Sequence, residues 1–168
     1  MTSEVRQRLK ERRERQELER LLHDASEIVT APTLATPEVP AGVLDAVRGF
    51  WSMSHEPAAT LNDSVPQEHL DAWVQELLAR HGFHTSAFLL TDLDVAPWIE
   101  FCMPPGWFAT IRRAREASWV FLRSDLGAVA AVSEQEYQFE FFVAPLPHAT
   151  PNPPRVHAAL LQRSSVAG

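Results

Sequence analysis

Three histidines are the residues best suited to ligating a metal ion. His81 and His84 are separated by two residues, and His69 lies upstream of them. This spacing differs from the H-E-x-x-H pattern, in which two histidines share one helical face with a glutamate between them. Gly82 directly after His81 is typical of the end of a helix, where an imidazole is favourable for the helix dipole. We therefore favour a helix-terminal role, with a small metal-dependent enzyme using the His69, His81 and His84 region as an alternative.

A pair of carboxylates, Asp92 and Asp94, lies close to Glu100 in the sequence. Paired carboxylates can serve acid/base chemistry or bind hard cations. Aspartates in a turn ahead of a proline, here Pro97, are also common because they make local hydrogen bonds, and the segment lacks the glycine and further ligands of a calcium loop. A turn role is favoured over a catalytic one.

Three arginines, Arg112, Arg113 and Arg115, form a basic cluster suited to recognising phosphate or carboxylate groups. Glu116 lies four residues after Arg112 and can neutralise it, so an ordinary solvated helix face is the favoured interpretation. The single cysteine, Cys102, excludes an internal disulfide and a cysteine-based metal site, and its apolar neighbours favour an inert core thiol over a nucleophile.

Two tryptophans are poorly explained by the apolar stripes of the sequence. Trp98 and Trp107 each lie beside proline in a loop-rich stretch. Core filling is favoured for both, but tryptophan is enriched at binding hot spots, so they are also the best candidates for exposed interface anchors.

Charge restricts the classes of partner. The formal net charge of the 168 residues is -7, and residues 1–30 hold seven basic and seven acidic residues, so the deficit falls on the remainder. An acidic body repels nucleic acid and anionic membrane surfaces but attracts a basic protein. No run approaches the ~18 apolar residues of a membrane helix. We therefore expect a cytoplasmic protein whose partner is another protein, with no membrane partner, nucleic acid disfavoured and no cofactor.

The chain divides into four parts that would position these residues. Residues 1–29 predict a charged helical arm, because strong helix formers dominate and apolar residues gather only in its second half. A proline-rich linker is expected at 30–42, an α+β body at 43–145 and a loosely ordered tail at 146–168, with a possible helical turn at 157–161.

Helices are expected at 43–51, 64–81 and 107–114 from apolar residues at helical spacing. The second of these has a capping-box pattern, Ser64 with Gln67, and Gly82 as a stop. Residues 107–111 would also suit a strand, although a short helix is favoured.

Strands are expected at 86–90, 98–103, 119–123, 128–132 and 137–143. The first two predict a hairpin. The last three are joined by short turns, which predicts an antiparallel meander. In the turn at 124–127, Gly127 is expected to supply a positive φ.

The predicted fold is α+β, with a long charged N-terminal helix, two to three packed helices and an antiparallel sheet of about five strands, the helices covering one face. The predicted function is a small non-catalytic module that docks on a larger partner through its N-terminal helix and acidic loops. A toxin-immunity or antitoxin-like inhibitor of a basic enzyme is the alternative. The residues expected to contact the partner are Arg6, Arg12, Arg13, Asp92, Asp94, Trp98, Trp107, Asp125, Glu134 and Glu136.

Overall fold

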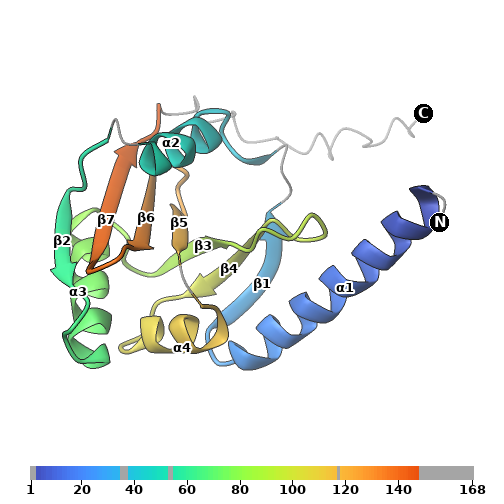
Figure 1. Cartoon of the computed structure of the whole chain (residues 1–168), viewed down its shortest axis with the longest axis horizontal. Helices are drawn as coiled ribbons and strands as arrows, with labels where there is room; N and C mark the ends of the chain where they lie inside the picture. Colours follow the sequence, from blue (N-terminus) through green and yellow to red (C-terminus); the bar gives the residue numbers. More distant parts are fainter. Residues whose placement is uncertain (1–2, 35–37, 53–54, 117, 148–168) are drawn as a thin grey trace, which may run out of the picture.

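The protein folds as an α+β structure built on one antiparallel sheet (Figure 1). The computed structural model describes residues 3–34, 38–52, 55–116 and 118–147, with the backbone alone for 30–34. Its elements are α1 (Ser3–Asp24), β1 (Val29–Leu34), α2 (Gly42–Trp51), β2 (Ala59–Asn62), α3 (Gln67–Arg80), β3 (Ser86–Leu90), β4 (Trp98–Cys102), α4 (Trp107–Ala114), β5 (Trp119–Arg123), β6 (Ala128–Glu134) and β7 (Gln138–Pro145).

Seven strands pair in the order β1-β4-β3-β5-β6-β7-β2. The predicted hairpin is confirmed as β3 and β4, which pair from Ser86 opposite Cys102 to Leu90 opposite Trp98. The predicted meander is confirmed as β5, β6 and β7. The segment at 107–114 is the helix α4 rather than a strand.

The two edge strands were not predicted. β1 pairs with β4 and occupies the first part of the expected linker, which was therefore wrong for residues 30–34. Its register shifts between Val29 and Thr33, so Pro32 lies within an irregular stretch of an edge strand, where a missing N–H is tolerated. β2 pairs with β7 and is only four residues long.

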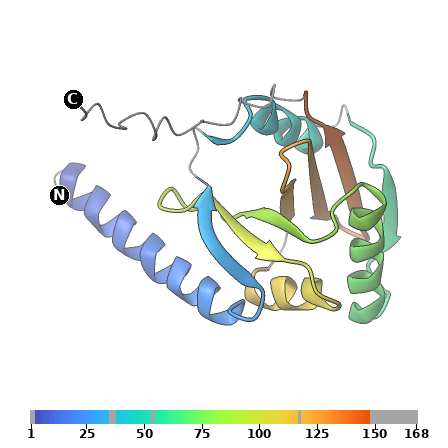
Figure 2. The same cartoon turned by 180° about the vertical axis from the view of Figure 1, so that it is seen from behind.

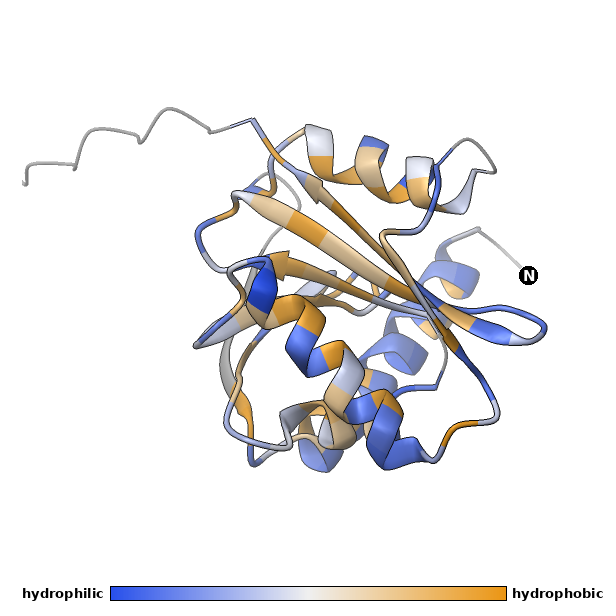
Figure 3. Cartoon of the chain, turned by 90° about the vertical axis from the view of Figure 1, so that its left-hand side faces the viewer, coloured by the Kyte–Doolittle hydropathy of each residue, from blue (hydrophilic) through white to orange (hydrophobic). Residues whose placement is uncertain are grey.

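Helices cover both faces of the sheet, and the expectation of one covered face was wrong (Figures 1 and 2). α1, α3 and α4 pack on a cluster that includes Leu89, Phe101 and Phe121. α2 packs on the opposite face, over Leu122 and Phe142. The central strands β5 and β6 are buried on both sides, so each face needs a helical layer. Figure 3 shows the resulting apolar strands between more polar helices.

The start of α3 differs from the predicted capping box. The helix begins at Gln67, and no side chain caps its first turn. The Ser64 backbone N–H donates to Asn62 Oδ1 at 2.9 Å, and the Ser64 hydroxyl contacts the same oxygen. This local turn occupies the serine that the pattern had assigned to the helix. The predicted stop is confirmed, because Gly82 follows α3 with φ 86°.

The turn between β5 and β6 has a different glycine requirement from the one predicted. The positive φ belongs to Leu126, at 61°, and not to Gly127. Gly127 lies beside the Arg123 guanidinium instead, where a Cβ would lie 2.5 Å from Nη2, so a larger residue would displace that side chain. The expected tail is described only as far as residue 147, and Leu146 is buried against the α2 face. The helical turn proposed at 157–161 lies outside the described residues.

Among the helices that the structure describes, none is long and apolar enough to cross a membrane.

Candidate functional site

Three of the five acidic residues predicted to contact a partner are engaged within the protein. Asp92 pairs with Arg115, and Asp94 pairs with Lys10 of α1. Asp125 accepts two hydrogen bonds from the guanidinium of Arg123, at 2.7 and 2.9 Å. The side chains of Asp92, Asp94 and Asp125 are nevertheless 68%, 74% and 60% exposed, so these aspartates are paired within the protein but still accessible to a partner.

The remaining two acids, Glu134 and Glu136, are exposed at the turn between β6 and β7. Neither forms an ion pair with another described residue. Tyr137 in the same turn is 69% exposed. A hydrogen bond to Glu136, together with burial and the charge of Asp63, raises the pKa of the Tyr137 phenol above its ordinary 10.0. The turn therefore presents negative charge beside an exposed aromatic ring.

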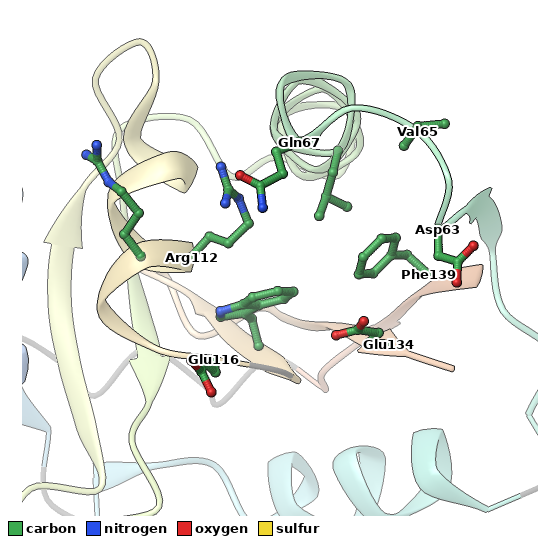
Figure 4. Close-up of a pocket in the computed structure, with 10 residues that line it drawn as sticks. Asp63, Val65, Gln67, Arg112, Glu116, Glu134 and Phe139 are labelled. Carbon is green, nitrogen blue, oxygen red and sulfur yellow. The ribbon is translucent and has the colours of Figure 1, made fainter. Parts of the chain in front are cut away.

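A groove of about 580 Å³ opens beside this turn, between α3, α4 and the ends of three strands (Figure 4). In the figure, Phe139 points into the groove, while Arg112 extends from α4 toward Gln67. The floor is apolar and preformed, since Leu70, Trp119 and Phe139 are at most 8% exposed. The groove is lined by Asp63, Val65, Gln67, Leu70, Arg112, Arg113, Glu116, Trp119, Glu134 and Phe139.

A bidentate ion pair forms one wall of the groove. Arg112 Nε donates to Asp71 Oδ1 at 2.7 Å, and Arg112 Nη2 donates to Asp71 Oδ2 at 2.9 Å. The hydrogen bond to Asp71 is the main reason that the pKa of Arg112 lies above its usual range. Glu116, the neutralising partner predicted from sequence, is not the one observed. The Arg112 charge is already compensated and belongs to the structure of the wall.

The other two arginines of the cluster differ from each other. Arg115 donates to the Thr91 carbonyl and pairs with Asp92, which ties α4 to the loop between β3 and β4. Arg113 is exposed and lines the groove. The predicted solvated helix face therefore describes Arg113 but not Arg112 or Arg115, whose side chains are 17% and 20% exposed.

Both candidate interface tryptophans are core residues. Trp98 is 2% exposed and lies under α2, and Trp107 is 4% exposed and packs against Phe101 and Phe121. Their use as exposed anchors was wrong, because each begins a regular element whose first side chain points into the core.

The histidines do not converge. His81 is the C-cap residue of α3, and its ring stacks on Phe141 with centroids 5.8 Å apart. His69 is in the first turn of the same helix, at its opposite end. Within the described ranges, no group of three or more His, Cys, Asp and Glu residues is placed to hold a metal ion. Cys102 is half-buried, and its Sγ lies 3.1 Å from the Ile28 carbonyl oxygen.

The N-terminal helix is held by one side only. Leu21 and Ala25 pack into the core, with Leu18 partly buried against it. Further toward the N-terminus the contacts are polar. Glu14 accepts a hydrogen bond from the Val95 backbone N–H at 3.2 Å, and Lys10 pairs with Asp94. The second half of α1 thus packs on the core, where the apolar residues of the predicted arm gather, and its middle contacts the loop between β3 and β4.

The side of α1 turned away from the body is a second candidate surface. Helical periodicity places Val5 and Leu9 roughly 160° around the axis from Leu21 and Ala25. Val5 and Leu9 are each 44% exposed and lie one turn apart. We define the outer face of α1 as the residues on this side in its first four turns: Val5, Arg8, Leu9, Arg12, Arg13 and Gln16.

The outer face carries positive charge without compensation. Arg8, Arg12 and Arg13 are exposed and form no ion pair with any residue that the structure describes. Glu11 and Glu14 are partly buried and point the other way. Arg6, also predicted to contact a partner, is exposed at the margin of this face. The arm therefore has equal numbers of basic and acidic residues, but unpaired positive charge gathers on its outer face.

Comparisons with protein families, with characterised proteins and with solved structures find no match to the chain. The two surfaces are therefore interpreted from their own chemistry. The groove and its wall were missed by sequence reasoning, although Asp71 gave a signal. It falls on the apolar stripe of α3 between Leu70 and Val74, and a buried carboxylate needs a cation, for which the cluster on α4 was the available source.

Proposed function

We propose that the protein is a small non-catalytic binding module that docks on a larger protein through the N-terminal helix and the acidic residues at the groove. The observation that carries this proposal is the asymmetry of α1. One side is fastened by Leu21, Ala25 and Glu14, while the other presents Val5 and Leu9 among unpaired arginines. A helix that is already folded and fixed on one side can present an apolar pair flanked by arginines to a partner without a large ordering cost.

The acidic end of the groove supports a second contact. Asp63 and Glu134 line it, with Glu136 in the adjacent turn, and the apolar floor gives a partner side chain a preformed seat. The carboxylates that the sequence offers for acid/base chemistry, Asp92 and Asp94, each form an ion pair. A binding role is therefore a better account of the polar residues than a catalytic one.

The test is a pull-down from native lysate with full-length protein and surface variants, followed by mass spectrometry. A truncation at Pro32 is unsuitable, because it removes Leu21, Ala25 and Ile28 from the core and cuts β1. Val5→Ser with Leu9→Ser removes only exposed apolar groups, and Leu44→Ser on α2, 47% exposed, is the matched control.

A stoichiometric partner retained by the native protein and by the Leu44 variant, but lost by the Val5/Leu9 variant, is the expected result. Equal retention by all three would show that the helix is not a docking surface. Retention of no stoichiometric protein by any of them would contradict the proposed function as a whole.

The inhibitor alternative is favoured by one specific observation: Asp63 and Glu134, which line the groove, and Glu136 in the adjacent turn form no ion pair with a described residue. An acidic surface of this kind can block a basic active site and speed its capture. Coexpression with any toxin-like gene found beside this one tests the idea, and finding no such gene would argue against it. Rescue of growth that is lost with Glu134→Gln plus Glu136→Gln, and kept with Asp45→Asn plus Glu56→Gln, would support it. No rescue by the native protein would exclude it.

A further inference from the structure

The distribution of charge around α1 identifies the chemistry of its partner. Over residues 3–16, the acids Glu11 and Glu14 lie on the side opposite the outer face by helical periodicity, and Glu4 lies at its margin, one turn before Arg8. The outer face has Arg8, Arg12 and Arg13 around the apolar pair Val5 and Leu9. A complementary surface must therefore supply carboxylates on both sides of a small apolar centre.

We propose that the outer face of α1 binds an acidic amphipathic helix of the partner protein, with apolar side chains of that helix packed over Val5 and Leu9 and its carboxylates paired with Arg8, Arg12 and Arg13. This inference rests on the proposed function, since it names the partner surface for the same helix. Two helices can pack along such a ridge because residues four apart are neighbours on a helix surface.

A helix is favoured over other acidic occupants by the position of the apolar pair. Val5 and Leu9 lie between the arginines, where a phosphate backbone offers nothing apolar to cover them. Outside residues 1–30 the chain carries the whole net charge of -7, which repels nucleic acid and anionic lipid. A second copy pairing through the same face would bring like arginines together.

Binding of a designed peptide tests this inference directly. The probe is the fluorescent peptide Ac-EEALEEALEELAEE-NH2, titrated with the full-length protein at low and high salt. The controls are the same peptide with lysine in place of every glutamate, vesicles containing phosphatidylserine, and a short DNA duplex. The variants are Arg12→Gln with Arg13→Gln, and Val5→Ser with Leu9→Ser. Arg48→Gln with Arg80→Gln removes the same charge from exposed positions on α2 and α3 and serves as the matched control.

We expect saturable binding of the acidic peptide and none of the lysine peptide. The Arg12/Arg13 variant should weaken binding about three- to tenfold, and the Val5/Leu9 variant about tenfold. The matched control should bind as the native protein does. Raising the ionic strength about tenfold should also weaken binding, because the arginines are exposed.

Three results would overturn the inference: equal binding by the Arg12/Arg13 variant, tighter binding of DNA or vesicles than of the peptide, or self-association that depends on the outer face. Its failure is distinguishable from failure of the docking function. A partner that depends on Val5 and Leu9 in the pull-down, without binding of the acidic peptide, would keep the function and remove the acidic helix. Peptide binding at the outer face, with no partner retained in the pull-down, would keep the acidic-helix inference and contradict the docking function.

Discussion

Arginine has opposite uses in the two candidate surfaces. In the wall of the groove, Arg112 is 17% exposed and gives two hydrogen bonds to Asp71. On the outer face of α1, Arg12 and Arg13 are exposed, without an ion pair to a described residue. The side chain is the same, but the distance to a carboxylate decides whether it supports the fold or remains available for a partner. Counting arginines in a sequence cannot separate the two.

The contrast between the buried and the exposed arginines predicts the largest loss of stability for substitution of Asp71, the partner of Arg112. Asp71→Ala should lower the free energy of unfolding by about 3 kcal/mol, because it leaves the Arg112 guanidinium partly buried without its partner. Glu76→Gln on the same helix, which breaks the exposed pair with Arg80, should change it by about 0.5 kcal/mol or less. Urea unfolding of both variants measures the difference.

A double-mutant cycle sharpens this prediction. Replacing both partners, with Asp71→Leu and Arg112→Met, should cost less than either single replacement, since no charge is then left unpaired. Equal destabilisation by Asp71→Ala and Glu76→Gln would mean that the Arg112–Asp71 pair stabilises the fold no more than an exposed surface pair does.

Two leucines on α1 test whether its packed side stabilises the fold while its outer face does not. Leu21→Ala should cost about 2–3 kcal/mol, because Leu21 is 4% exposed and truncation leaves a cavity. Leu9→Ala makes the same chemical change at a position that is 44% exposed, and should cost less than about 0.5 kcal/mol. Thermal unfolding of the pair gives the answer, and a loss at Leu9 as large as at Leu21 would place the outer face inside the fold.

Neighbouring arginines on and after α4 provide a smaller contrast. Arg115→Gln should cost about 1–2 kcal/mol, since it removes the contacts to the Thr91 carbonyl and to Asp92. Arg113→Gln, at an exposed position, should be neutral within about 0.5 kcal/mol. Similar values for the two would contradict the assignment of Arg115 to the structure.

The smallest effect is a titration. Tyr137 is the single tyrosine of the chain, so its ionisation can be followed by tyrosinate absorbance. Glu136→Gln should move its raised pKa back toward 10.0, because the hydrogen bond to the carboxylate is the first cause of the shift. A raised pKa favours the neutral phenol in the fold, so the stabilisation is present below 10.0 and is lost as pH rises through the folded pKa.

Asp45→Asn, on the opposite side of the sheet, is the control for this titration and should leave the pKa unchanged. An unchanged Tyr137 pKa in the Glu136→Gln variant would show that the hydrogen bond from Tyr137 to Glu136 is not the cause of the shift.

The parts of the fold that could be predicted are those with local signals. Consecutive apolar residues marked β5, alternation marked β7, the short turns joined them through β6, and Gly82 marked the end of α3. β1 and β2 were missed because they are edge strands, whose pairing partners lie far along the chain and whose sequences include Pro32 or only four residues. Helices cover both faces because β5 and β6 are buried on both sides, and the consecutive apolar residues of β5 are a local sign of this burial.

The candidate site was less predictable, because it depends on tertiary pairing. The sequence contained every charged residue of the groove and the arm, but it could not show that Asp92, Asp94 and Asp125 are paired while Glu134 is not. Helical periodicity alone could have separated the outer face of α1 from its packed side. For Trp98 and Trp107, adjacent prolines suggested loops, although both residues open regular elements.

The edge positions of β1 and β2 also determine how the sheet assembles. β5, β6 and β7 are joined by short turns and can pair with little loop-closure entropy, whereas Ala59 must find Phe141 and Val29 must find Phe101. We therefore expect the sheet to assemble outward from its centre. Each edge strand precedes its pairing partner in the chain, β1 before β4 and β2 before β7, so both edge pairings can form only after those partners have been synthesised.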